Sequence, residues 1–110
     1  MPLEKVPLGR TGLTVGRLVY GTLPGGPLQK DLPPAGLGAL LVRAVRGGVT
    51  LIDTANGYRN YAHVRAGLEA LPAAEARAVS IATKSPSADP VEFRGQLERA
   101  LSELDRPRVE

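Results

Sequence analysis

The stretch Val49-Thr-Leu-Ile-Asp-Thr-Ala-Asn-Gly-Tyr58 decides the fold, because an apolar run ends there in polar residues and a turn. Residues 49–53 have the β-branched and apolar composition of a buried strand. A helical pattern follows over 60–71, and Pro72 stops it. Its apolar positions share one face: Tyr61, Val64, Leu68 and Leu71. This order of strand, loop and helix predicts one β–α unit.

Two further β–α units flank this one. A strand-like run over 17–22 precedes a helical pattern over 35–46, which ends at Gly47-Gly48. Another strand-like run over 78–83 precedes a helical pattern over 90–104. Strands that alternate with helices predict parallel pairing with right-handed crossovers.

The third helix has the clearest start signal. Asp89 suits the N-cap position and Pro90 suits the first helical position. Glu92 stands three residues after Asp89, so we expect a capping box, in which its carboxylate bonds the backbone N–H of Asp89.

A small hairpin is expected before the first unit. The runs Val6-Pro-Leu8 and Leu13-Thr-Val15 flank Gly9-Arg-Thr-Gly12, which has the composition of a turn. The chain is therefore expected to have an α/β fold, with an N-terminal β-hairpin followed by three βα units. The pattern alone leaves two architectures open, a doubly wound sheet and part of a (β/α)8 barrel.

Composition excludes several classes of protein. The 110 residues include no cysteine, which excludes a disulfide, a thiolate nucleophile and a cysteine-ligated metal, and the lone His63 makes any metal site unexpected. No apolar run approaches the roughly 18 residues of a membrane span, and no signal peptide is evident. We therefore expect no membrane partner and a cytoplasmic location. The net charge of +3 comes from scattered arginines, so no nucleic-acid partner is expected.

Polar side chains collect where the expected strands end. Gly21-Thr22 follow the first strand, Asp53 and Tyr58 follow the second, and Lys84 follows the third. Carboxyl ends of parallel strands meet at one rim in both architectures. A phenol has a pKa of about 10, an adjacent ammonium lowers that pKa, and a carboxylate keeps the ammonium charged. The trio therefore suits proton donation to a carbonyl oxygen as hydride arrives from a nicotinamide.

Four stretches occur in a fixed order along the chain: Leu8-Gly-Arg-Thr-Gly-Leu-Thr-Val15, Gly21-Thr22, Asp53-Thr-Ala-Asn-Gly-Tyr58 and Ala82-Thr-Lys84. Together they resemble the N-terminal part of an aldo-keto reductase. The resemblance continues in register through Leu101-Ser-Glu-Leu104 and covers essentially the whole chain. Gly26-Pro-Leu-Gln29 and the spacing of Tyr58 and Tyr61 further resemble a bacterial branch of that family.

The resemblance implies a partial (β/α)8 barrel, in which residues 1–110 are the N-terminal portion and the hairpin closes the bottom. It implies reduction of small aldehydes or ketones with NADPH or NADH. Carried over residue by residue, Tyr58 is the general acid, Lys84 depresses the pKa of Tyr58, and Asp53 orients Lys84. Gly21, Thr22 and Asp53 are then expected near the nicotinamide and its ribose.

Part of the family pattern has no counterpart. The family places a catalytic His at the end of strand four, whereas His63 falls in the helix over 60–71 and is expected to be solvated or partly packed. Arg59 stands where Gly is common, and Ala62-His63 stand where the family often has an acidic residue. The family holds the adenosine phosphate of its cofactor near strands seven and eight. We therefore expect these 110 residues alone to bind no cofactor tightly and to be inactive.

Two other functions stay open at the level of sequence. A non-catalytic interaction or regulatory subunit on a reductase-like scaffold would not need Asp53, Tyr58 and Lys84, which argues against it. A flavodoxin-like domain would need Ser, Thr or Gly after its first strand, where Pro24 and Pro27 interrupt the loop. Three parallel strands leave two unpaired edges, so self-association through these edges is also expected.

Overall fold

A two-stranded hairpin precedes a three-stranded parallel sheet in the computed structural model, which describes residues 3–110. The hairpin pairs β1 (Lys5–Pro7) with β2 (Thr14–Gly16) in antiparallel fashion. The sheet has the order β3-β4-β5, with bounds Val19–Gly21, Leu51–Asp53 and Ser80–Ala82. Both pairings in the sheet are parallel, which confirms the expected hairpin and the three strands.

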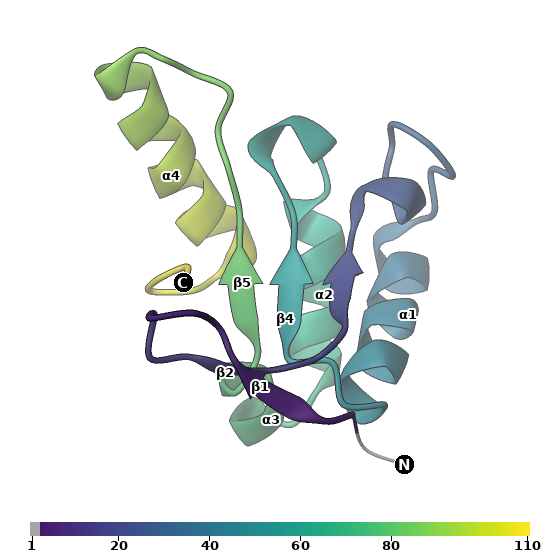
Figure 1. Cartoon of the computed structure of the whole chain (residues 1–110). Helices are drawn as coiled ribbons and strands as arrows, with labels where there is room; N and C mark the ends of the chain where they lie inside the picture. Colours follow the sequence, from purple (N-terminus) through teal and green to yellow (C-terminus); the bar gives the residue numbers. More distant parts are fainter. Residues whose placement is uncertain (1–2) are drawn as a thin grey trace.

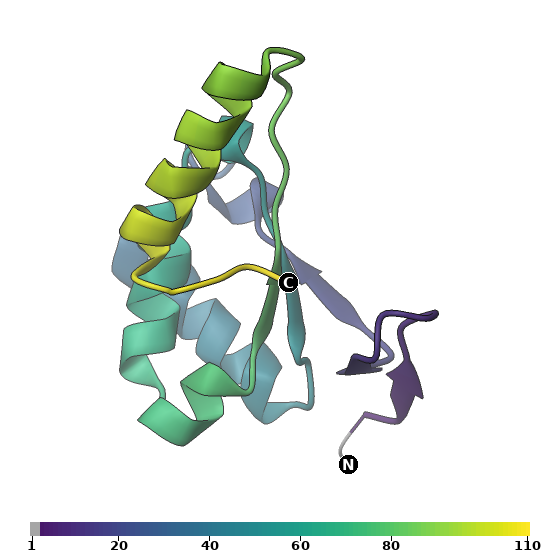
Figure 2. The same ribbon diagram turned by 90° about the vertical axis from the view of Figure 1, so that its left-hand side faces the viewer.

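The helices cover one face of this sheet, and the other face is open with the hairpin at its base (Figures 1 and 2). The α-helices are α1 (Pro34–Arg46), α2 (Tyr61–Ala70), α3 (Ala73–Arg77) and α4 (Pro90–Leu104). Two 3-10 turns, η1 (Leu23–Gly25) and η2 (Asn56–Tyr58), follow the ends of β3 and β4. One sheet with helices on a single face is the arrangement of part of a (β/α)8 barrel, in which the open face points to the barrel axis.

The core lies between the sheet and its helices. Ile52 and Ile81 are fully buried at the centres of β4 and β5. They belong to one cluster with apolar residues of the helices, among them Leu41, Val64, Leu68, Ala100 and Leu104. Because successive side chains of a strand alternate between faces, Asp53 and Ala82 point to the open face. The packing of the helices thus directs a carboxylate toward the side of the sheet that they leave uncovered.

The hairpin is fixed to the amino-terminal end of the sheet. The backbone N–H of Gly16 donates to Oγ1 of Thr50, just before β4, over 2.8 Å. A Cβ atom on Gly16 would come within 2.4 Å of the carbonyl oxygen of Gly48, so glycine is required for this close approach. The hairpin therefore lies at the opposite end of the sheet from the candidate site residues.

The segment after Leu68 differs from expectation. The sequence pattern extends the second helix to residue 71, but α2 ends at Ala70 and Leu71 is extended, with φ −90° and ψ 150°. Pro72 then precedes the short helix α3, which the pattern does not predict. The reason is that a proline disfavours helical backbone in the residue before it but suits the start of a new helix.

The expected capping box at α4 is wrong. The carboxylate of Asp89 accepts from the backbone N–H of Val91, so Asp89 is the N-cap as expected. The backbone N–H of Asp89, however, donates to Oγ of Ser87, and that hydroxyl donates to Glu92. Ser87 thus takes the place that the capping box gives to the Glu92 carboxylate, because its hydroxyl lies between the two groups.

The free side of β5 is partly paired by the last residue of the chain. The backbone N–H of Glu110 donates to the carbonyl of Ile81 over 2.9 Å, and the Glu110 carboxylate accepts from the Ile81 N–H over 2.7 Å.

Within residues 3–110, no helix is long and apolar enough to cross a membrane.

Candidate active site

The carboxyl ends of the three strands bring the expected site residues to one rim. Gly21, Asp53 and Ala82 occupy the same register position on β3, β4 and β5, at the last pair of each ladder. The pairing continues one step further, where the N–H of Thr22 donates to the Asp53 carbonyl and the N–H of Thr54 donates to the Ala82 carbonyl. The loops that carry Tyr58 and Lys84 begin from this rim.

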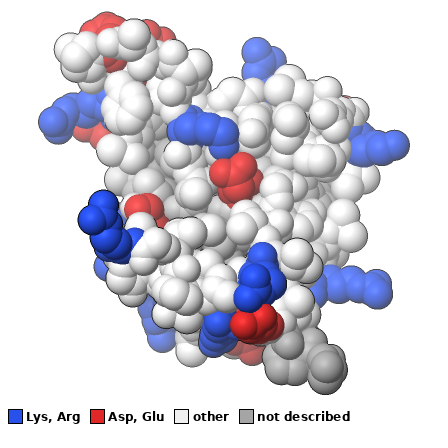
Figure 3. Space-filling model, in the orientation of Figure 1, with Lys and Arg blue, Asp and Glu red and all other residues white. Residues whose placement is uncertain are grey.

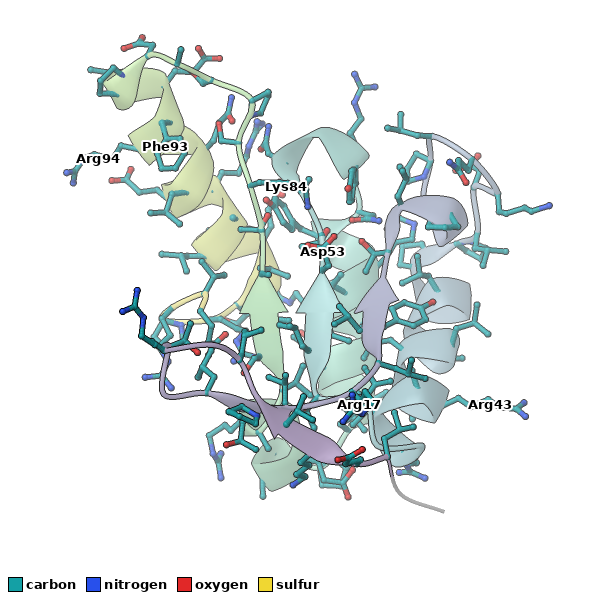
Figure 4. The ribbon with its side chains drawn as sticks, viewed as in Figure 1. Arg17, Arg43, Asp53, Lys84, Phe93 and Arg94 are labelled. Carbon is teal, nitrogen blue, oxygen red and sulfur yellow. The ribbon has the colours of Figure 1, made fainter. Side chains whose placement is uncertain are left out.

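Lys84 and Asp53 form an ion pair on the open face. The Nζ atom of Lys84 lies 3.2 Å from each carboxylate oxygen of Asp53 and also donates to the carbonyl of Thr54 over 2.8 Å. The two labelled side chains point toward each other in Figure 4. In the same orientation, Figure 3 shows a basic and an acidic side chain in contact, surrounded by uncharged surface. Three bonds therefore fix the position of the ammonium group.

Tyr58 lies beside this ion pair. It is the last residue of η2, and its ring centroid is 5.0 Å from Nζ of Lys84, within the range of a cation–π interaction. The loop is held close because the N–H of Asn56 donates to the carbonyl of Lys84 over 3.0 Å. The structure thus brings together all three residues of the expected catalytic trio.

The backbone conformation at Arg59 accounts for the glycine that is common at this position in the family pattern. Arg59 ends η2 in the left-handed conformation, with φ 56° and ψ 36°. Glycine adopts this conformation at a lower cost than residues with a Cβ, so a position of this geometry favours glycine. Arg59 keeps the same turn despite its side chain.

The electrostatic balance of the site favours a charged Lys84. Burial lowers the pKa of Lys84, but the hydrogen bond and charge of Asp53, together with the same interactions from Tyr58, outweigh burial and raise that pKa overall. About half of each paired side chain is exposed, 51% for Lys84 and 41% for Asp53. Lys84 is therefore a stable positive charge next to the phenol at neutral pH.

Gly21 and Thr22 differ in what they present to the open face. Gly21 is exposed, and a Cβ atom built on it would meet nothing within 4 Å. Thr22 is fully buried, and its hydroxyl and its carbonyl both bond to Asn60. At the end of β3, Gly21 rather than the Thr22 side chain is therefore open to a ligand on this face.

Asn60 is a buried polar residue whose role the sequence pattern does not predict. It has no exposed surface, and its side chain bonds to residues at the ends of both β3 and β4. The only sequence signal is its place just before the second helix, where Asn is common as an N-cap. That signal gives no hint of bonds to Thr22, which is 38 residues away in the sequence.

His63 is more deeply buried than a solvated helix residue. It is 8% exposed, and its Nε2 atom lies 2.9 Å from the carbonyl oxygen of Leu32. This contact joins α2 to the loop that precedes α1. His63 is therefore a packed residue of the helix layer.

Tyr61 has a position distinct from that of Tyr58. It is buried in the core, and its hydroxyl lies 2.7 Å from Oγ1 of Thr83. Burial raises the pKa of Tyr61 more than the hydrogen bond to Thr83 lowers it. Tyr58 rather than Tyr61 is thus the phenol beside Lys84.

The fold of this chain is similar to that of known proteins, although its sequence is not significantly similar to any curated protein and no family model matches it. Among solved structures, a candidate aldo-keto reductase from Pseudomonas aeruginosa superimposes with a TM-score of 0.79 and 29% identity. That match covers 96% of this chain and 43% of the other. The chain has the fold of the N-terminal part of an aldo-keto reductase.

Other solved structures agree with this assignment. Another structure described as an aldo-keto reductase from Pseudomonas aeruginosa gives a TM-score of 0.77 and 28% identity, over 96% of this chain and 43% of the other. The aldo-keto reductase of Bombyx mori, solved in complex with NADP, gives a TM-score of 0.79 and 18% identity, over 100% of this chain and 37% of the other. The chain thus spans less than half the length of the reductases that it matches, and its partial barrel fold is confirmed.

Proposed function

We propose that Asp53, Lys84 and Tyr58 form the proton-donating part of a carbonyl-reducing site. The observation that carries the proposal is the position of the Lys84 ammonium, 3.2 Å from both carboxylate oxygens of Asp53 and 5.0 Å from the ring centroid of Tyr58. The likeness to aldo-keto reductase structures supports an oxidoreductase scaffold for this trio.

The proposed reaction converts an aldehyde or ketone to an alcohol. Tyr58 donates its phenolic proton to the carbonyl oxygen as a hydride adds to the carbonyl carbon, so the π bond of the carbonyl breaks and O–H and C–H bonds form. A reduced nicotinamide, when bound, supplies the hydride. The ammonium of Lys84 stabilises the phenolate that remains, and Asp53 keeps that ammonium charged and in place.

The open face of the sheet is the proposed position of the nicotinamide. Gly21, Asp53 and Ala82 form a row of small side chains around one carboxylate, and no atom lies within 4 Å of a Cβ built on Gly21. A planar ring could lie over Gly21, and the exposed carboxylate of Asp53 could accept from ribose hydroxyls. NADPH and NADH have the same nicotinamide and the same ribose attached to it, so this part of the site would accept either cofactor.

A chimaeric enzyme tests the proposed function. This chain would replace the matching 43% of the Pseudomonas aeruginosa reductase, and aldehyde-dependent oxidation of NADPH would be followed by absorbance. We expect turnover that the Tyr58→Phe variant lowers by about 10²- to 10⁴-fold, the usual contribution of a general acid. Tyr20→Phe is the matched control, because Tyr20 packs against the core behind the sheet. Equal loss in both variants, or none in Tyr58→Phe, would refute the assigned role.

The 110 residues alone are expected to bind NADPH or NADH weakly and to be inactive. Asp53 and Lys84 are each about half exposed, whereas electrostatic stabilisation of a transition state gains strength from the exclusion of water. A fluorescence titration of the purified chain with NADPH, followed by an aldehyde assay, checks this expectation. Micromolar affinity together with turnover would contradict it and would show that three strands suffice.

A further inference from the structure

We propose that Asn60 is a positioning residue that locks the ends of β3 and β4 together and, through Thr54, fixes the place of Lys84. This inference rests on the proposed function, because it concerns the support of the same ion pair. Among the described residues, the side-chain hydrogen bonds of Asn60 go to Thr22 and Thr54 and not to Asp53, Tyr58 or Lys84. The influence of Asn60 passes through the hydrogen bonds that it makes under the rim.

The side-chain amide of Asn60 is bonded from both strand ends. Its Oδ1 atom accepts from the hydroxyl of Thr54 over 2.9 Å and, more weakly, from the hydroxyl of Thr22 over 3.4 Å. Its Nδ2 atom donates to the carbonyl of Thr22 over 3.0 Å. The carbonyl oxygen of Thr22 can only accept a hydrogen bond, so it fixes Nδ2 as the end of the amide that faces it. The hydroxyls of Thr22 and Thr54 then donate to Oδ1.

Thr54 connects this amide to the proposed site. Its hydroxyl bonds to Asn60, its N–H donates to the carbonyl of Ala82, and its carbonyl accepts from Nζ of Lys84 over 2.8 Å. The residue before it in the chain is Asp53, whose carboxylate binds the same ammonium. A fixed Thr54 side chain therefore also fixes the Asp53 carboxylate and the Thr54 carbonyl, the two groups that orient Lys84.

The surroundings of Asn60 leave it little freedom. Its backbone carbonyl accepts from the N–H groups of His63 and Val64 in the first turn of α2. On its other side, a Cβ atom on Gly26 would come within 2.9 Å of Nδ2 and 3.2 Å of the Asn60 Cβ. The helix start and the close approach of Gly26 thus fix a fully buried amide, and losing one of its buried partners leaves a polar group unpaired.

The residue type follows from this geometry. Aspartate has the same shape, but it offers an acceptor to the Thr22 carbonyl, which needs a donor, and it buries a charge. Leucine fills a similar volume but leaves the Thr22 carbonyl and the Thr54 hydroxyl without a partner. Only an amide of this length supplies a donor to β3 and an acceptor to β4 at once.

Two matched substitutions test the inference. Thr54→Val and Thr22→Val each remove one hydroxyl from Oδ1 of Asn60 with little change of shape, and they differ in that Thr54 also holds Lys84. The probe is the side chain of Lys84, followed by NMR on the full chain with ¹³C-labelled lysine. The sequence contains three lysines, so Lys5 and Lys30 provide reference signals in every spectrum.

We expect Thr54→Val and Asn60→Leu to shift the titration midpoint of Lys84 downward, because its bonds to Asp53 and the Thr54 carbonyl become less well placed. Thr22→Val should shift that midpoint much less, since the bond it removes is the 3.4 Å one. Arg106→Met controls for stability alone: it removes two part-buried bonds to residues that precede β5, far from the rim, and should leave the Lys84 signal unchanged. If Asn60→Leu does not fold, Thr54→Val still decides.

Failure of this inference and failure of the proposed function give different results. Asp53→Asn must lower the titration midpoint of Lys84 if the ion pair exists, and no change in that variant would contradict the proposed function itself. If Asp53→Asn lowers the midpoint but Thr54→Val does not, the ion pair stands and the positioning role of Asn60 is refuted. An equal shift in Thr54→Val and Arg106→Met would also overturn it, because it would reveal a general effect of lost stability.

Discussion

The contact between α1 and α2 depends on glycine, and substitution of Gly38 by alanine should weaken the fold. Gly38 is fully buried in α1, opposite Gly67 of α2. A Cβ atom at residue 38 would lie 2.9 Å from the backbone nitrogen of Gly67 and 3.2 Å from the carbonyl carbon of Ala66. These are backbone atoms of a packed helix, so they cannot move aside without shifting the whole of α2.

Two opposing effects set the size of the change. Overpacking against a rigid neighbour costs about 1–3 kcal/mol. Replacing glycine by alanine within a helix gains about 0.5–1 kcal/mol. The net expectation for Gly38→Ala is a loss of about 0–2.5 kcal/mol in the free energy of unfolding. Gly95 in α4 is the matched control, because a Cβ atom there would meet nothing within 4 Å and Gly95→Ala should gain about 0.5–1 kcal/mol.

Urea unfolding followed by far-UV circular dichroism measures both variants against the unsubstituted chain. The midpoint should fall for Gly38→Ala and rise for Gly95→Ala, with an unchanged slope in both. A Gly38→Ala variant as stable as Gly95→Ala would refute the argument, since it would mean that α1 and α2 are not in close contact at this point. The comparison is direct because both substitutions add one methyl group to a helix.

Three further predictions concern pH, a partly buried arginine and the sheet edge. The pKa values of the Lys84 and Tyr61 side chains are raised in the folded chain. The two protonated side chains therefore contribute their full stabilisation below about pH 10, and this stabilisation is lost as the pH rises through their folded-state pKa values. Urea midpoints at about pH 8 and pH 11 check this. Arg106→Met should cost about 1–3 kcal/mol, because it removes bonds to the carbonyls of Ala76 and Val79, of which the Ala76 carbonyl keeps the N–H of Val79 as a partner. Arg108→Met, at a side chain 79% exposed, should cost little in the same urea titration. We also propose self-association through the free edge at β3, where Val19 is 50% exposed; sedimentation velocity should show a concentration dependence that Val19→Lys reduces.

Much of the fold follows from local patterns in the sequence. Apolar spacing and the Gly and Pro signals predict α1 and α4 almost to their ends, and the alternation of strands and helices predicts a parallel sheet. The strands are shorter than expected because residues beside them bond elsewhere: the N–H of Val49 donates to the carbonyl of Ala44 in α1 instead of to β3. Helix α3 is not predicted, since five residues are too few for an apolar period to be recognised.

Some features of the candidate site could likewise be predicted from the sequence, and others could not. Asp53, Tyr58 and Lys84 could be selected because each follows a strand, and parallel strands place such residues at one rim whatever the details of packing. That Lys84 also bonds the carbonyl of Thr54 could not be predicted, because a backbone acceptor has no signature in the sequence. The burial of the Thr22 side chain was likewise hidden, because it depends on the approach of Asn60 from a different unit.

The sequence by itself therefore determined the order of elements and the types of groups at the rim, since both depend on residues near one another along the chain. The tertiary structure decided which of those groups face the open side and what holds them. Asn60 shows the difference: its amide joins two strand ends through bonds to Thr22 and Thr54, which no local pattern links. His63 shows it too, because only the fold brings its ring to the carbonyl of Leu32. Long-range hydrogen bonds of buried polar groups depend on packing, and packing exists only after the chain has folded.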